Sequence, residues 1–212
     1  MTLRVAVFTN GVYRQNCYIA GNDHKEALII DPGSDAGGIA ELINSNSLQP
    51  VAIICTHAHF DHVGAVADLM DQFSIPFFIN GNDAALLRRM NLYKMIVDPG
   101  AALRVPAITR DLVNESGFLQ IANFAVNILN TPGHTPGGVC FRIEDHIFIG
   151  DTVLPAGVGR IDLPGGDADA MAQSLKQLSA LPKDLTSHPG HGASMPLGEL
   201  LAQGLEATST RT

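Results

Sequence analysis

Hydrophobic residues occur along the chain in short runs that glycine, proline and asparagine separate. Short runs rich in β-branched residues are typical of strands. Other segments carry apolar residues three and four positions apart, which places them on one face of a helix. This pattern predicts strands over residues 4–8, 17–20, 27–30, 51–55, 76–79, 124–129, 139–143 and 147–149, and helices over residues 39–43, 61–73, 83–96, 168–181 and 197–205.

Two aspartates stand at the start of predicted helices. Asp167 follows the turn sequence Pro164-Gly165-Gly166, and Asp83 opens the segment 83–96. An aspartate in this position can accept a hydrogen bond from an amide of the first helical turn. We therefore expect both residues to be N-caps.

The order of the predicted elements mixes strands and helices without a fixed repeat or a low-complexity linker. A chain of 212 residues is long enough to bury a substantial core. We expect one α/β domain over residues 1–212. Cys17, Cys55 and Cys140 form no close-spaced motif, and we expect all three to be reduced thiols.

Charge and hydropathy exclude several classes of protein. The 13 Lys and Arg residues are outnumbered by 21 Asp and Glu, and the net charge is −8. Nucleic-acid binding relies on clustered basic residues, so we expect no such partner. The sequence shows neither a signal peptide nor a membrane span of roughly 18 apolar residues. We expect a cytoplasmic protein with no membrane partner, either a monomer or a small homo-oligomer.

The densest group of chemically active residues is the segment Thr-His-Ala-His-Phe-Asp-His at residues 56–62. It begins where the strand over 51–55 ends, so its first histidines lie in a connecting loop. In an extended segment His57 and His59 point to the same side. Asp61 and His62 turn with the following helix toward a different centre. This arrangement favours two neighbouring metals over one.

Three further segments place a His or Asp just after a predicted strand. These residues are His134, Asp151 and His191. If the strand ends share one edge, all seven side chains meet there. Gly133 and Gly190 would allow the backbone to pass close to the site.

The number and type of these donors point to catalysis rather than structure. A structural zinc site closes with four ligands that usually include Cys thiolates. The seven candidates include no Cys, and such a surplus of nitrogen and oxygen donors suits a two-metal site that keeps positions open for water and substrate. We expect two divalent metal ions, with zinc as the leading candidate and iron, manganese or cobalt as alternatives.

These motifs, together with Thr-Pro-Gly-His-Thr, Gly-Asp-Thr and Pro-Gly-His, resemble those of the metallo-β-lactamase superfamily over about residues 5 to 195. The resemblance implies a four-layer αββα sandwich with the site at one edge. It implies one metal held by His57, His59 and His134, a second held by Asp61, His62 and His191, and a bridge at Asp151.

Four other residues are compared with the family pattern. Asp31 falls where the family carries a carboxylate behind the ligands, although a turn-forming Asp before a proline is an equal alternative. His24, His146 and His188 match no ligand position.

The resemblance also implies a reaction. A metal-bridging hydroxide would attack a carbonyl, with Asp61 and Asp151 as catalytic residues that hold the metals. Metal binding lowers the pKa of water from 15.7 to about 7, and the metals stabilise the developing oxyanion. Thioesters suit this chemistry because a thiolate leaves without being protonated.

The segment 158–167 resembles glyoxalase II-like hydrolases and the related persulfide dioxygenases, which act on glutathione-linked sulfur substrates. Arg160 aligns with a basic residue that contacts glutathione in glyoxalase II, and a surface Arg without a role is the alternative. The chain ends at Thr212 without the C-terminal helical domain of glyoxalase II, so we expect a short form. Gly192-Ala193 replaces a Glu-Tyr pair, which weakens the case for glutathione.

The expected function is hydrolysis of a thioester, with hydroxyacylglutathione, such as S-lactoylglutathione, as the leading substrate. The main alternative is a mononuclear iron persulfide dioxygenase with His57, His134 and Asp151 as a facial triad. A β-lactamase role is disfavoured by the missing secretion signal. A nuclease role is disfavoured by the acidic charge. A non-enzymatic metal-binding role is disfavoured by the intact ligand set.

Overall fold

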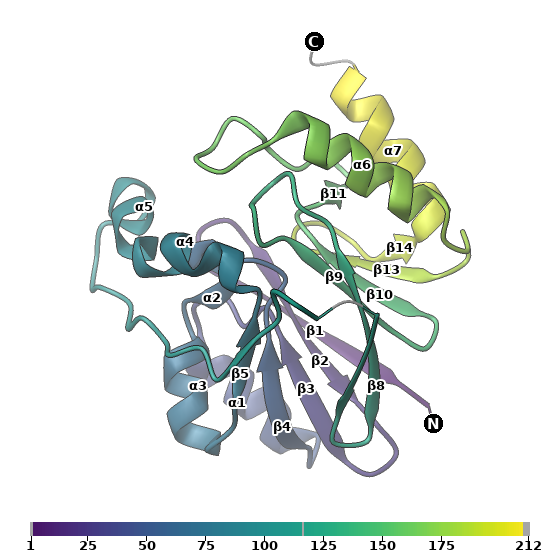
Figure 1. Cartoon of the computed structure of the whole chain (residues 1–212). Coiled ribbons are helices and arrows are strands. Elements are labelled where there is room, and N and C mark those ends of the chain that lie inside the picture. Colours follow the sequence, from purple (N-terminus) through teal and green to yellow (C-terminus); the bar gives the residue numbers. More distant parts are fainter. Residues whose placement is uncertain (1, 116, 210–212) are drawn as a thin grey trace.

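The computed structural model describes residues 2–115 and 117–209. Two sheets pack face to face, and helices cover the outer face of each (Figure 1). The first sheet has the order β1-β2-β3-β4-β5-β6 and the second has the order β14-β13-β10-β9-β8-β7. The predicted four-layer αββα sandwich is confirmed.

The strands of the first sheet are β1 (Arg4–Asn10), β2 (Gln15–Gly21), β3 (Glu26–Ile30), β4 (Gln49–Ile54), β5 (Phe77–Ile79) and β6 (Arg110–Asp111). The second sheet contains β7 (Gly117–Ile121), β8 (Phe124–Asn130), β9 (Val139–Ile143), β10 (His146–Gly150), β13 (Thr186–Pro189) and β14 (Met195–Pro196). A separate short ribbon pairs β11 (Val153–Leu154) with β12 (Gly157–Val158).

The helices are α1 (Ala36–Ser45), α2 (Phe60–Val63), α3 (Val66–Phe73), the 3₁₀ turn η1 (Gly81–Asp83), α4 (Ala84–Arg88), α5 (Met90–Val97), α6 (Ala168–Ser179) and α7 (Leu197–Ser209). No helix in the described ranges is long and apolar enough to cross a membrane.

The four layers follow from the alternation of side chains along the strands. Ile29 packs under the helices of the first sheet, while its neighbours Leu28 and Ile30 point into the space between the sheets. In the second sheet Phe148 points inward, and Ile147 packs on the other face beneath α6 and α7. Because successive residues of a strand face opposite ways, strands buried on both faces read as continuous apolar runs.

Two predicted helices are each broken in the structure. The segment 61–73 divides into α2 and α3 because Ala65 N donates to the carbonyl of Gly33 rather than continuing the helix. The segment 83–96 divides into α4 and α5 at Arg89, where Arg89 N bonds to Leu86 and Leu92 N bonds to Arg89 in tighter turns. The pattern also missed the short strands β6, β11, β12 and β14, as well as β7.

The predicted caps have different outcomes. Asp167 caps α6, since its carboxylate accepts a hydrogen bond from Ala170 N at 2.9 Å. Asp83 precedes α4, but its side chain makes no capping bond and is used elsewhere. The three cysteines are buried and free, as predicted.

The direction of the strands determines at which edge of the sandwich the site lies. β3, β4 and β5 run parallel, as do β10 and β13 of the other sheet. Across the sheets, Val139 N at the start of β9 donates to Thr56 O just after β4 at 2.9 Å. Within the second sheet, Gly190 N just after β13 donates to Gly150 O at the end of β10 at 2.8 Å. The loops that follow these strands therefore meet at one edge of the sandwich.

Candidate metal centre

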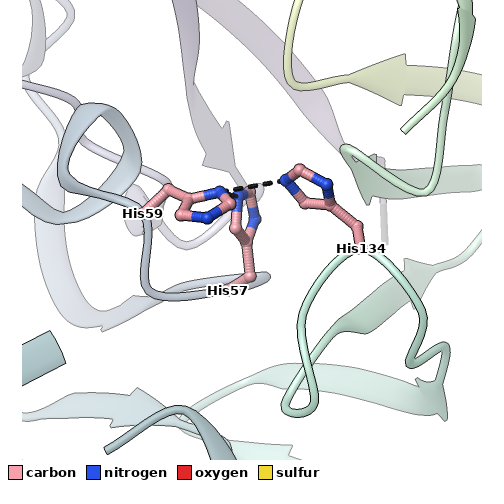
Figure 2. A group of neighbouring side chains, drawn as sticks. All are labelled: His57, His59 and His134. Carbon is pink, nitrogen blue, oxygen red and sulfur yellow. Dashed lines mark hydrogen bonds between the residues drawn. The ribbon is translucent and has the colours of Figure 1, made fainter. Parts of the chain in front are cut away.

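Three histidines from two loops meet at this edge. His57 and His59 lie in the loop after β4, and His134 lies in the loop after β8. The Nδ1 atom of His59 is 3.0 Å from Nε2 of His57 and 2.9 Å from Nε2 of His134. Figure 2 shows the three rings turned toward one another. These ring nitrogens form one group that could hold a metal ion.

A second group lies beside the first and consists of Asp61, His62 and His191. The carboxylate of Asp61 is 3.4 Å from Nε2 of His191 and 3.9 Å from Nε2 of His62. Asp61 and His62 belong to α2, and His191 follows β13. The turn of the short helix thus directs these two side chains to a different point from His57 and His59, as the sequence predicts.

Asp151 lies between the two groups. Its Oδ2 atom is 3.7 Å from Nε2 of His134 and 3.5 Å from Nε2 of His191, and its Oδ1 atom is 3.5 Å from Nε2 of His62. One carboxylate therefore faces ligand candidates from both groups. This position is the one that a bridging ligand requires.

The far nitrogens of four rings are held by hydrogen bonds. Nδ1 of His134 donates to Arg160 O at 2.7 Å, and Nδ1 of His191 donates to Tyr13 O at 3.1 Å. Metal-binding histidines commonly use their second nitrogen in this way, which fixes the ring and its tautomer. The Nε2 lone pairs of these rings are thereby directed to the centre.

The other two rings depend on one buried carboxylate, Asp31. Its Oδ2 atom accepts from His62 Nδ1 at 3.0 Å and from the hydroxyl of Thr56 at 2.6 Å. Because Thr56 donates to Asp31, its oxygen is left to accept from Nδ1 of His57, which lies 3.1 Å away. Asp31 thus supports one ligand candidate in each group, and the turn-forming alternative does not describe its role.

The electrostatics of the centre fit a cation. Burial lowers the pKa of His57 well below its usual value and that of His59 to about 4, so both rings are neutral at pH 7. Burial opposes charge on His62 and Asp151 as well, but their attraction raises the pKa of His62 and lowers that of Asp151. In the part of the chain that the structure describes, His62 Nε2 and Asp151 Oδ1 are buried without a hydrogen-bond partner. Such atoms are costly to bury unless a ligand completes them.

Asp83 joins the two loops that carry the first group. It is fully buried, and its carboxylate accepts hydrogen bonds from Ala58 N at 3.0 Å, Thr135 Oγ1 at 2.9 Å and Gly137 N at 2.6 Å. Ala58 lies between two of the histidines and Thr135 follows the third. The sequence marked Asp83 only as a helix cap, because nothing local reveals partners 25 and more positions away.

A pocket of about 580 Å³ opens over the centre. Arg160 lines it, but its guanidinium is paired with Asp162 through two bonds, from Nε to Oδ1 at 2.9 Å and from Nη2 to Oδ2 at 2.8 Å. The role of Arg160 in substrate binding stays a prediction. Tyr13, which the sequence did not single out, lines the pocket and also anchors His191.

The structure therefore brings together all seven of the residues that the sequence singled out as ligands. In the described ranges, His24, His146 and His188 belong to none of the groups that could hold a metal. Fold and site together are those of a metallohydrolase whose metal centre lies at one edge of two packed sheets. The sequence profile of the Metallo-beta-lactamase superfamily matches residues 10–191, and the chain belongs to this superfamily.

Similar proteins support this assignment. The chain is 29% identical to hydroxyacylglutathione hydrolase GloC of Haemophilus influenzae, with 93% of this chain and 94% of that protein covered. The solved structure of TTHA1623 in a di-iron-bound form is 36% identical, with a TM-score of 0.84 and coverage of 95% of this chain and 98% of that one. The BLEG-1 B3 metallo-beta-lactamase is 32% identical, with a TM-score of 0.89 and coverage of 97% and 100%.

Proposed function

We propose that the protein hydrolyses thioesters at a centre of two divalent metals, with hydroxyacylglutathiones such as S-lactoylglutathione within its substrate range. The observation that carries the proposal is the position of Asp151 between two complete groups of ligand candidates. The similarity to GloC supports the substrate class. Zinc is the leading candidate, and the di-iron-bound relative keeps iron as the alternative.

The residues of the site would have different roles in such a reaction. His57, His59 and His134 would hold one metal, Asp61, His62 and His191 the other, and Asp151 would face both. When bound, metals of this type lower the pKa of water and polarise a carbonyl oxygen. The protein itself fixes the ligand rings through Asp31, Thr56 and backbone carbonyls, so that little reorganisation is needed during turnover.

Hydrolysis breaks the carbonyl carbon–sulfur bond and forms a carbon–oxygen bond from water. The products are a carboxylate and a thiolate, which takes a proton from solvent near neutral pH. No general acid is required at the leaving group. The described lining of the pocket is mostly apolar, which suits a leaving group that departs without one. A thioester therefore suits the site better than an amide does.

The test is a substrate panel on metal-loaded protein with metal content measured in parallel. We expect cleavage of S-lactoylglutathione or another acyl thioester, and about two metals per chain. Asp151→Ala should abolish turnover and lower the metal content. Failure on every thioester would refute the proposal.

The rival activities are distinguished in the same panel. One iron per chain together with oxygen uptake that depends on glutathione persulfide would instead establish the dioxygenase. Cleavage of nitrocefin, a β-lactam, in the absence of thioester cleavage would establish a β-lactamase like the BLEG-1 relative.

A further inference from the structure

The pocket over the metal centre has a polar floor and apolar walls. Its floor is formed by ligand candidates, among them His59, Asp61 and Asp151. Most of its apolar wall comes from two parts of the chain that the ligand motifs do not include, and Tyr13, Phe60 and Leu86 complete it. The two parts are α5 and the segment that follows Asp151, which contribute Tyr93, Ile96, Val97, Leu154, Val158 and Leu163.

The α5 wall presents apolar surface to solvent. Ile96 is 81% exposed and Val97 is 41% exposed, although both line the pocket. Large apolar side chains that rim a pocket next to polar groups mark a place where an apolar ligand is buried. Because β4 and β5 are parallel, the helices that follow β5 lie at the same edge of the sheet as the ligand loop after β4. The exposed surface of α5 is thus available to a substrate that reaches the metals.

The positive charge available to an anionic substrate is small. Among the described residues that line the pocket, Arg160 is the one Lys or Arg. Asp162 already pairs with one edge of its guanidinium, through Nε and Nη2, in the two-bond geometry that a substrate carboxylate would use. A glutathione carboxylate would have to compete with Asp162 for this edge, and the negative charge of Asp162 weakens its attraction to the guanidinium.

We propose that this pocket selects thioesters with an apolar, uncharged acyl group and a neutral carrier over glutathione-linked ones. The side chains of α5 form the surface that recognises the acyl group, and Asp162 keeps Arg160 from attracting carboxylates. This inference rests on thioester hydrolysis, and it assigns substrate preference to residues outside the metal site.

A series of acyl groups on a neutral carrier tests the apolar wall. We expect kcat/KM for propionyl-, butyryl- and hexanoyl-N-acetylcysteamine to rise about 2-fold for each added methylene, since full burial gives about 4-fold and this wall is partly open. Hexanoyl-N-acetylcysteamine should also exceed S-lactoylglutathione. A flat or falling series would overturn the inference but leave thioester hydrolysis standing. Cleavage of no thioester would refute both.

Ile96→Gln tests the role of α5 directly. It should lower kcat/KM for the hexanoyl substrate about 3- to 10-fold and change the propionyl rate and the metal content less than 2-fold. Phe118→Gln is the matched control, because Phe118 is 67% exposed on β7 and lies outside the pocket lining. The affinity for S-hexyl-N-acetylcysteamine, an uncleavable thioether, measured by calorimetry, should weaken in the Ile96 variant alone. Equal effects of the two variants would overturn the assignment.

Asp162→Asn tests whether Asp162 keeps the positive charge of Arg160 from attracting substrate carboxylates. Exposed ion pairs are weak, so release of Arg160 should raise kcat/KM for S-lactoylglutathione only about 2- to 5-fold. The rate on the neutral hexanoyl substrate should stay the same. An unchanged ratio between the two substrates would show that Asp162 does not control the charge of the pocket.

Discussion

Replacement of Asp83 by alanine tests whether a carboxylate outside the ligand set controls the metal centre. The substitution leaves the amides of Ala58 and Gly137, which donate to Asp83 at 3.0 and 2.6 Å, without their acceptor in a buried position. Each buried amide left unpaired costs about 1–3 kcal/mol. Burial raises the pKa of Asp83 above its usual value even though the hydrogen bonds from Thr135, Gly137 and Ala58 lower it, so relief of this desolvation offsets part of the loss.

We therefore expect Asp83→Ala to lower the free energy of unfolding by about 2–4 kcal/mol, a large share of the 5–15 kcal/mol typical of a domain. Metal affinity should fall about 10- to 100-fold, because the loops that carry His57, His59 and His134 lose their common support. Urea unfolding of the metal-free protein measures the first effect, and chelator competition measures the second.

Glu26→Ala is the matched control. The Glu26 carboxylate accepts from Asn22 Nδ2, Asn123 N and Asn123 Nδ2, which gives three donors as for Asp83, at the opposite end of β3 from the metal edge. It should cost about 1 kcal/mol because its site is open to water, and metal affinity should not change. If Asp83→Ala destabilises the fold but binds metal as tightly as the unchanged protein, Asp83 is a fold residue only and the reasoning is wrong.

Three other predictions concern the same structure. Gly190→Ala should weaken metal binding about 10- to 100-fold, since the added Cβ would lie 2.1 Å from Asp151 Oδ1. Gly37→Ala is the control and should not weaken metal binding, because its added Cβ meets nothing closer than 3.6 Å. Titration of metal-free protein with zinc should saturate at about two equivalents and raise Tm, because the metals bind the folded state; saturation at one equivalent with no further rise would contradict the two-group arrangement. Burial, with neighbouring His146, lowers the pKa of His188 to about 3. The unfolded chain therefore gains a proton between pH 6.5 and 3 that the folded chain does not, and stability should fall by up to about 1.4 kcal/mol per pH unit as pH falls. In His188→Phe this contribution should be absent from urea midpoints measured between pH 4 and 7, and an unchanged pH slope would contradict the shift.

Most of the ligand candidates were predictable because they stand in loops directly after apolar strands, and Asp61 and His62 follow in the short helix that continues the first of these loops. Strand ends can be recognised from local sequence, and parallel strands bring their carboxyl ends to one edge, so His57, His134 and Asp151 could be placed together without knowledge of the loops. The division into two groups followed from the change from extended chain to helix between His59 and Asp61. Both steps depend on periodicity over only a few residues.

The residues that were misjudged depend on contacts between distant segments. The helix over 61–73 breaks because the carbonyl of Gly33 takes the amide of Ala65, and no pattern within the helix shows this competition. Asp83 has the local sequence of an N-cap but is used by loops around residues 58 and 135. In both cases a tertiary hydrogen bond replaced the local one that the sequence favours.

The ligand loop after β4 is fixed by two buried carboxylates that play different parts. Asp31, which adopts a positive φ of 49°, orients the rings of His57 and His62 from behind, while Asp83 holds the backbone between His57 and His59 and ties it to the His134 loop. The side chain of Ile96 on the α5 wall shares neither of these supports, because it is 81% exposed, and the Asp162 side chain is paired with Arg160 instead. The α5 side chains and the Arg160–Asp162 pair are not ligand candidates, although the backbone carbonyl of Arg160 accepts from Nδ1 of His134. We therefore expect side-chain changes in α5 and at Asp162 to alter the preferred thioester while every ligand candidate stays in place.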